Sequence, residues 1–197
     1  MKKLDQKPRY QKDANVKQKK ITPEYKSIWK ILDLIPKDLP LIDIACAEGF
    51  IVYMADQRGF NKTYGIEIDE GRVKRGRDNL GVNIDAADTF ESLHLMKDYK
   101  VFVVSRFFHN VGLEKSKELM DAIDKNDDYI IINKHKPGPR KETGEKRELL
   151  ATKKGINGFM EQYGLTKKSF SQDVVVAAKG KYEYIPEILR KYIPEPC

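Results

Sequence analysis

The sequence predicts an α/β fold in which a mostly parallel sheet is covered by helices on both faces. Between residues 41 and 133, short apolar segments alternate with segments of helical periodicity. Such an alternation is typical of parallel strands joined by crossover helices. Two further strand-like segments then follow closely at 165–171 and 173–180. A crossover needs a dozen or more residues, so these two segments are expected to form an antiparallel hairpin.

The first predicted element is a helix that begins after Thr22, which can cap it, and ends before Pro36. Pro23 suits the first helical position, and apolar residues recur along the segment at helical spacing. The parallel strands are expected at 41–45, 62–69, 82–86, 99–105 and 128–133, with helices at 49–59, 70–81 and 113–124. A further helix is expected through 148–164, and a short one at 187–192.

Positive charge is concentrated at the N-terminus. The chain has a net charge of +7, and residues 1–20 hold eight basic and two acidic residues, a net +6 that leaves +1 for the rest. This arm is too poor in apolar residues to fold alone, so we expect a disordered, solvated tail. The alternative is an arm that contacts phosphates or acidic surfaces. The expected organisation is this arm, a domain over 21–180, and an extension over 181–197 that packs back on the domain.

Other features of the composition favour a soluble, cytoplasmic protein. No run of about 18 apolar residues predicts a membrane span. The basic N-terminus lacks the apolar region of a secretory signal. The two cysteines, Cys46 and Cys197, are expected to be free thiols, and the pair is too small a set for a zinc site.

The segment "PLIDIACAEGF" at 40–50 joins the first predicted strand to the helix that follows. An apolar strand carrying Asp43 runs into a turn of small residues, and Gly49 opens the helix. The first N–H groups of a helix carry the positive end of its dipole, and such turns bind nucleotide-like ligands in many open α/β sheets. An ordinary strand–helix turn is the alternative interpretation.

A second acidic residue, Glu67, ends the next strand, 24 residues after Asp43. A carboxylate accepts two or more hydrogen bonds at once and therefore suits a pair of ribose hydroxyls. Asp69 is a substitute for this role. Capping of the following helix is the alternative role for an acid at this place.

The predicted strand pattern and four segments together resemble the class I methyltransferases that use S-adenosylmethionine (SAM). The resemblance covers about residues 22–180, and its segments are "IDIACAEGF", "YGIEID", "IDAADTF" and "VVSRFFHNVG". It implies a seven-stranded, mostly parallel sheet of order 3-2-1-4-5-7-6 with an antiparallel last strand. It also implies that SAM or S-adenosylhomocysteine binds at the carboxyl ends of the strands.

In the first segment, Asp43 matches the family's acid, and Ala45, Ala47 and Gly49 occupy the positions of its three glycines. The resemblance implies that these residues and Phe50 contact the methionine portion of SAM. Alanine is tolerated without strain only where φ stays negative. Two interpretations follow: the alanines leave the backbone room for the cofactor, or they mark a site that no longer binds it.

The other cofactor contacts implied by the resemblance come from three further strand ends. They are Glu67 with Ile68 at the ribose, Asp88 with Thr89 at the adenine (Asp85 being the alternate), and Ser105 with Phe107 beside the transferable methyl.

Two residues are candidates for catalysis. His109 follows the fourth strand and could act as a general base for an oxygen acceptor, although a structural histidine is the alternative. Lys134 matches a lysine of the RNA ribose 2′-O-methyltransferases, whose paired aspartate is replaced here by Ser105. The segment 105–108 also lacks the proline pair of amino and nucleobase methyltransferases. The basic stretch 134–141 could bind a phosphate-bearing acceptor such as RNA.

The sequence therefore predicts a SAM-dependent methyltransferase of unidentified acceptor, with nucleic acid slightly favoured. The alternative is a non-catalytic SAM- or nucleic-acid-binding module on the same fold. A dinucleotide-dependent oxidoreductase fits less well, because the chain ends in a hairpin and lacks a Gly-x-Gly-x-x-Gly segment.

Overall fold

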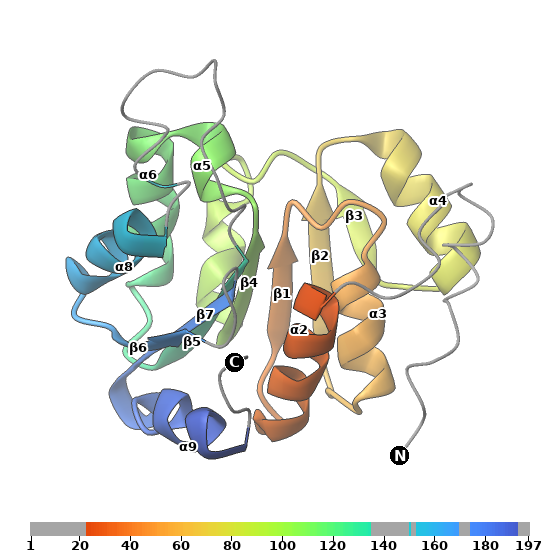
Figure 1. Cartoon of the computed structure of the whole chain (residues 1–197). Helices are drawn as coiled ribbons and strands as arrows, with labels where there is room; N and C mark the ends of the chain where they lie inside the picture. Colours follow the sequence, from red (N-terminus) through yellow and green to blue (C-terminus); the bar gives the residue numbers. More distant parts are fainter. Residues whose placement is uncertain (1–22, 135–149, 151–152, 170–173, 193–197) are drawn as a thin grey trace.

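A computed structural model describes residues 23–134, 150, 153–169 and 174–192 of the chain. The strands are β1 (Leu41–Ile44), β2 (Thr63–Glu67), β3 (Ile84–Ala86), β4 (Val101–Ser105), β5 (Tyr129–Lys134), β6 (Thr166–Ser169) and β7 (Val174–Lys179). They form one seven-stranded sheet of order β3-β2-β1-β4-β5-β7-β6 (Figure 1). β1 to β5 pair in parallel, and β7 runs antiparallel to both β5 and β6. The predicted fold class is confirmed.

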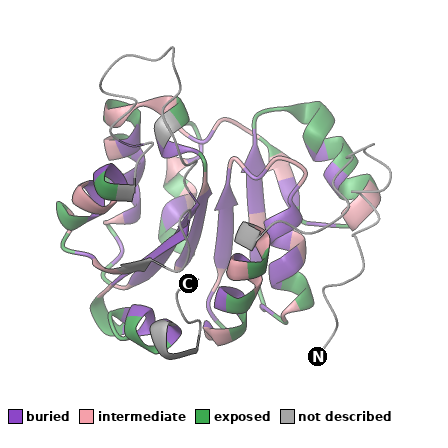
Figure 2. Ribbon diagram, in the orientation of Figure 1, coloured by how far each residue is buried: buried purple, intermediate pink, exposed green. Residues whose placement is uncertain are grey.

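Helices cover both faces of this sheet, as Figure 1 shows. They are α2 (Pro23–Leu34), α3 (Phe50–Gln57), α4 (Glu70–Leu80), α5 (Phe108–Val111), α6 (Leu113–Ile123), α8 (Lys153–Glu161) and α9 (Ile185–Tyr192), with 3-10 turns η1 (Leu93–Asp98) and η2 (Gly180–Tyr182). Apolar residues of α2, α3 and α9 pack on one face, and those of α5, α6 and α8 pack on the other. The central strands are therefore buried on both faces (Figure 2).

Several element ends differ from the predicted ones for local reasons. β2 ends at Glu67 because Asp69 leaves the strand to cap α4, where its carboxylate accepts a hydrogen bond from the Arg72 N–H at 3.0 Å. Gly81 ends α4 in the left-handed conformation, as its position predicts. The 3-10 turn η1 was not predicted, and it delays the start of β4 from residue 99 to Val101.

Some predicted features lie outside the described residues. They are the basic arm over 1–20, the cap at Thr22, the stretch 135–141, the start of the helix expected from 148, and Cys197. Within the described part, Cys46 is a buried free thiol. No helix in that part is both long enough and apolar enough to span a bilayer.

Candidate functional site

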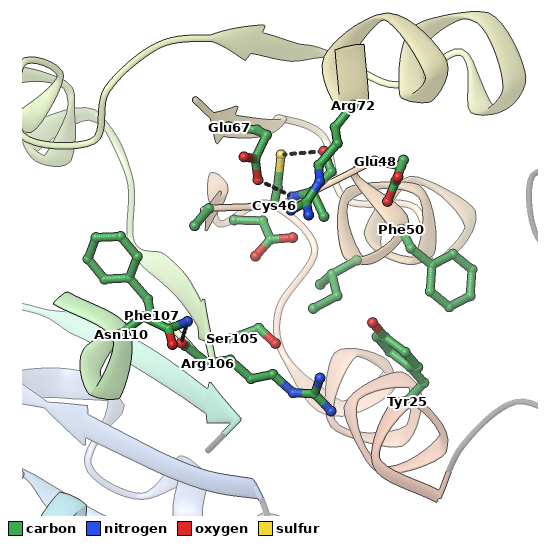
Figure 3. Close-up of a pocket in the computed structure, with 14 residues that line it drawn as sticks. Tyr25, Cys46, Glu48, Phe50, Glu67, Arg72, Ser105, Arg106, Phe107 and Asn110 are labelled. Carbon is green, nitrogen blue, oxygen red and sulfur yellow. Dashed lines mark hydrogen bonds between the residues drawn. The ribbon is translucent and has the colours of Figure 1, made fainter. Parts of the chain in front are cut away.

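A cavity of about 340 Å³ opens at the carboxyl ends of β1, β2 and β4 (Figure 3). Its walls come from four places: α2, the loop between β1 and α3, the β2–α4 junction, and the segment that follows β4. The lining residues are Tyr25, Asp43, Ala45, Cys46, Ala47, Glu48, Phe50, Ile51, Glu67, Arg72, Ser105, Arg106, Phe107 and Asn110. In open α/β sheets, this edge is where ligands bind.

Three lining residues have a left-handed backbone. Ala45, Ala47 and Arg106 have φ values of 55°, 53° and 59°, and they are the non-glycine residues with positive φ in the described part of the chain. This conformation costs an L-residue roughly 1–2 kcal/mol. Strain of this kind gathers at functional sites, where the surrounding structure holds it in place. The condition of negative φ is therefore not met at either alanine, and both have the backbone conformation that glycine adopts most easily.

Backbone hydrogen bonds hold the β1–α3 loop in this shape. The Cys46 N–H donates to the Ile66 carbonyl at 2.9 Å, and the Gly49 N–H donates to the Cys46 carbonyl at 2.8 Å. The Ala47 N–H donates to Oε2 of Glu67 at 2.8 Å. The loop is thus tied to β2 both by the strand backbone and by the side chain at the strand's end.

Glu67 is the side chain that links these two strand ends. It is 5% exposed, and its second oxygen, Oε1, accepts a hydrogen bond from the Asp69 N–H at 3.2 Å. Two backbone donors thus orient the carboxylate, which lines the cavity (Figure 3). Each carboxylate oxygen can accept more than one hydrogen bond, so acceptor sites are left for a ligand.

Asp43 lies deeper on the same wall and is 1% exposed. Its Oδ1 atom has no hydrogen-bond partner among the described residues. Burial, and to a lesser degree the charge of Glu67, raises the pKa of Asp43 well above its usual range. A buried carboxyl with an unsatisfied oxygen in a cavity wall is a ready acceptor for a ligand N–H, and especially for a cationic one.

The opposite wall follows β4. The Arg106 N–H donates to the Lys134 carbonyl at 2.6 Å, and its carbonyl accepts from the Asn110 side-chain amide at 2.6 Å. Phe107 is buried, and its ring lies 5.8 Å from that of Phe90. This wall presents a hydroxyl from Ser105, a guanidinium, an aromatic ring and an amide.

The two predicted catalytic residues differ in how they are placed. Lys134, 2% exposed at the end of β5, lies outside the cavity lining, with Nζ 4.2 Å from the centre of the Tyr25 ring. Tyr25 packs edge-on against Phe50 at 5.1 Å, so Lys134 supports the α2 side of the cavity through an aromatic contact. His109 lies within α5, and its side chain is outside the described part.

Four predicted cofactor residues do not line the cavity. Gly49 lies beneath the loop, where an added Cβ would meet the side chains of Ile84 and Val82 at 3.0 Å. Ile68 is beside the cavity and is 69% exposed. Asp88 accepts a hydrogen bond from the Phe90 N–H at 2.6 Å, and Thr89 is buried. The alternate, Asp85, accepts from the Tyr64 hydroxyl at 2.6 Å and pairs with Arg77.

Sequence reasoning missed five lining residues, which are Tyr25, Cys46, Glu48, Ile51 and Arg72. Tyr25 belongs to a helix that the sequence marks only as amphipathic, so nothing local signals that its first turn reaches the cavity. Arg72 lies on the first turn of α4, close to Glu67 in the chain. It belongs to no sequence motif, because the whole start of this helix is polar. Glu48 lies within the predicted loop, but only Asp43, Phe50 and the small residues at the glycine positions of that segment were assigned to the site.

The comparisons with known proteins agree on the fold. No family model matches the chain, and no curated protein matches it significantly. Among solved structures, magnesium protoporphyrin IX methyltransferase from Synechocystis with bound SAM aligns with a TM-score of 0.57 at 15% identity, over 80% of this chain and 77% of that one. The same enzyme with bound S-adenosylhomocysteine aligns at 0.57 and 14% identity, over 87% and 93%.

Two other solved structures give the same result. Precorrin-6y C5,15-methyltransferase from Geobacter metallireducens aligns with a TM-score of 0.55 at 16% identity, over 81% of this chain and 90% of that one. A SAM-dependent methyltransferase from Aquifex aeolicus aligns at 0.56 and 12% identity, over 80% and 92%. The chain therefore has the class I, Rossmann-like methyltransferase fold.

Proposed function

We propose that the chain is a SAM-dependent methyltransferase. The observation that carries the proposal is the convergence of Asp43 and Glu67 on one cavity, at the strand ends where the class I fold binds its ligand. Structural neighbours that contain SAM or S-adenosylhomocysteine support the same cofactor.

The residues present fit the chemical groups of SAM. The carboxylate of Glu67, oriented by two backbone donors, suits the two ribose hydroxyls. Oδ1 of Asp43 is an unsatisfied buried acceptor that suits the ammonium of the methionine portion, beside the loop of Ala45 and Ala47. We assign Phe50 to the same portion as a wall and Gly49 to the support of the loop.

We propose that the adenine is contacted by residues that lie next to the cavity but outside its lining. Ile68 exposes most of an apolar side chain directly after Glu67, and a flat adenine ring is a partner that would cover it. Asp88 and Thr89 follow β3 on the same side of the sheet edge and are proposed for the adenine amino group. Ser105 and Phe107 are proposed to border the reacting centre from the other wall.

When bound, SAM supplies an electrophilic methyl group on a sulfonium. The protein's part is to hold an acceptor nucleophile in line and to exclude water, which needs positioning more than a dedicated acid or base. His109 stays our proposal for a general base. Lys134 does not line the cavity, and its Nζ faces the ring of Tyr25. We therefore propose that Lys134 contributes by positioning Tyr25.

The alternative of a non-catalytic module, with the basic arm as its working surface, rests on the two alanines of the loop and on the atypical segment after the fourth strand. Both alanines have a left-handed backbone, which costs an L-residue roughly 1–2 kcal/mol, so the loop alone does not decide between the two proposals. Formation of S-adenosylhomocysteine during incubation with an acceptor pool separates the two readings. SAM binding without any such product would favour the binding module.

A nucleic-acid acceptor is a finer proposal that draws no support from the structural neighbours. It rests on the basic arm and on residues 134–141, most of which lie outside the described residues. Deleting residues 1–20 should weaken RNA binding and reduce its salt dependence if the arm contacts phosphates. Equal binding with and without the arm would reject that role.

A thermal-shift titration tests the proposed function. Saturating a protein of this size with SAM or S-adenosylhomocysteine at 100 times Kd adds about 2.7 kcal/mol to its stability, which raises Tm by roughly 5–10 °C. NAD serves as the control and should give no shift. No stabilisation by either SAM-type ligand at millimolar concentration would overturn the proposal.

A further inference from the structure

Arg106 stands out among the charged residues of the cavity. Its guanidinium lines the cavity and is exposed, and it makes no hydrogen bond or ion pair within the described part of the chain. The other arginine of the lining, Arg72, lies beside Asp69 with Nε 3.7 Å from Oδ2. The cavity therefore holds one guanidinium that is not matched by a carboxylate of the described residues.

The backbone around Arg106 is built to present this side chain. Its φ is 59°, a conformation that a non-glycine residue rarely adopts, and two hydrogen bonds of 2.6 Å fix its N–H and its carbonyl. The partners are the Lys134 carbonyl and the Asn110 side chain. A negative φ at this position would point the Arg106 side chain in another direction. The strained backbone therefore sets the direction of the side chain.

Charge is divided unevenly across the cavity. The acids Asp43, Glu48 and Glu67 all lie on the wall formed by β1, β2 and the β1–α3 loop. Arg106 lies on the facing wall, after β4, and Figure 3 shows its side chain extending across toward Tyr25. Under the proposed function, the acidic wall serves the cofactor, and the facing wall is left for the acceptor.

We propose that Arg106 binds an anionic group of the methyl acceptor, a carboxylate or a phosphate, and so selects acidic small-molecule acceptors. A guanidinium presents paired N–H donors that match two oxygens of such a group. Aromatic side chains of Tyr25 and Phe107 line the same cavity and suit an acceptor with a flat apolar body. This inference rests on the proposed function for its reading of the two walls.

The direct test uses small anionic probes on the full-length protein. Benzoate and phenyl phosphate are titrated calorimetrically, with and without saturating S-adenosylhomocysteine, and benzamide serves as the neutral match to benzoate. One or both anions should bind, and benzamide should not. Which anion binds more tightly separates a carboxylate acceptor from a phosphate acceptor.

Two variants of the residue make the test specific. Arg106→Met should weaken anion binding at least tenfold. The affinity of Arg106→Lys should lie between that of Arg106→Met and that of the wild type, because lysine keeps the charge but loses the paired N–H donors of the guanidinium. Lys74→Met is the matched control: it also removes one positive charge, but Lys74 lies outside the cavity lining and pairs with Asp78, which also lies outside it. It should change anion binding less than twofold.

The outcomes separate this inference from the proposed function. If the anions fail to bind at tens of millimolar, or bind Arg106→Met as well as wild type, the inference is wrong. A tenfold loss of S-adenosylhomocysteine affinity in Arg106→Met would also overturn it, since Arg106 would then serve the cofactor's own carboxylate. If S-adenosylhomocysteine does not bind wild type at all, the proposed function fails, while the titrations without it still decide whether Arg106 is an anion site.

Discussion

The two walls of the cavity both contain non-glycine residues with a left-handed backbone, but they carry mainly opposite charges. The wall after β1 and β2 has three acids, one arginine and a loop held by backbone hydrogen bonds. The wall after β4 has a cation, a hydroxyl and an aromatic ring. Both place non-glycine residues in the left-handed region. Under our proposals, the first wall meets the cofactor that class I methyltransferases share, and the second wall meets an individual acceptor.

The sharpest way to break this division is to remove the charge of Glu67. Glu67→Gln keeps the shape of the side chain but loses one acceptor oxygen and the charge. Hydrogen bonds to charged groups are worth about 1.5–3 kcal/mol, so S-adenosylhomocysteine affinity should fall roughly 100-fold. Calorimetric titration measures this loss. Glu70→Gln, at the exposed start of α4, is the control and should bind like wild type.

If instead Glu67→Gln binds the ligand normally, the acidic wall is not the ribose site. Arg106→Met on the facing wall provides the contrast, because our division predicts an unchanged affinity there. A reversed pattern, with the loss in Arg106→Met alone, would exchange the roles of the two walls.

The second effect concerns the buried carboxyl of Asp43 in the ligand-free protein. Burial raises its pKa above the usual 3.8, so its contribution to stability is fully present below that pH and is lost as pH rises toward the folded-state pKa. The slope is at most about 1.4 kcal/mol per pH unit. Asp43→Asn should remove this slope, so the variant gains on wild type as pH rises from about 4.

Urea unfolding of both proteins between pH 4 and 8 measures the difference. Asp78→Asn, at an exposed site on α4 where the carboxylate pairs with Lys74, is the control and should follow wild type. Parallel curves for wild type and Asp43→Asn would mean that the carboxyl is satisfied in solution. In that case the buried acceptor that we assign to the cofactor's ammonium would be absent.

The third effect tests how tightly the loop sits on the sheet. An added Cβ at Gly49 would meet Ile84 and Val82 at 3.0 Å, in a backbone with φ of 72°. Gly49→Ala therefore combines strain with overpacking and should cost about 2–3 kcal/mol in the free energy of unfolding. Gly81→Ala has the strain alone, since nothing lies within 4 Å, and should cost about 1–2 kcal/mol. Equal losses by urea denaturation would show that the loop is loosely packed.

Much of the fold follows from spacing that is visible in the sequence. The buried strands β4 and β5 are continuous apolar runs, and the short interval between 165–171 and 173–180 forces an antiparallel pair. The turn η1 escaped prediction because short 3-10 turns leave no periodic pattern. The ends of some strands differ from the predicted ones because a residue expected in the strand, such as Asp69, instead caps the following helix.

The site was only partly predictable, for a different reason. The resemblance to the class I methyltransferases singled out Asp43 and Glu67, and Glu67 also lies at the expected spacing of 24 residues after Asp43. Residue type alone does not fix backbone dihedrals, so the sequence did not show that Ala45 and Ala47 have positive φ. Tyr25 reaches the cavity through the packing of α2, a long-range contact that no local pattern encodes.

The smallest predicted effect compares the strain of the two walls directly. Ala47→Gly and Arg106→Gly each place glycine where the backbone is already left-handed. Each should relieve about 1–2 kcal/mol of strain, offset by the larger unfolded-state entropy of glycine, for a net gain of roughly 0.5–1 kcal/mol in urea unfolding. Similar gains would mean that both walls store strain in the folded protein. A gain in Ala47→Gly alone would mean that the arginine side chain itself stabilises its segment. A loss in both variants would mean that the left-handed turns are not strained in solution, which would remove the main argument that the two walls were shaped by function.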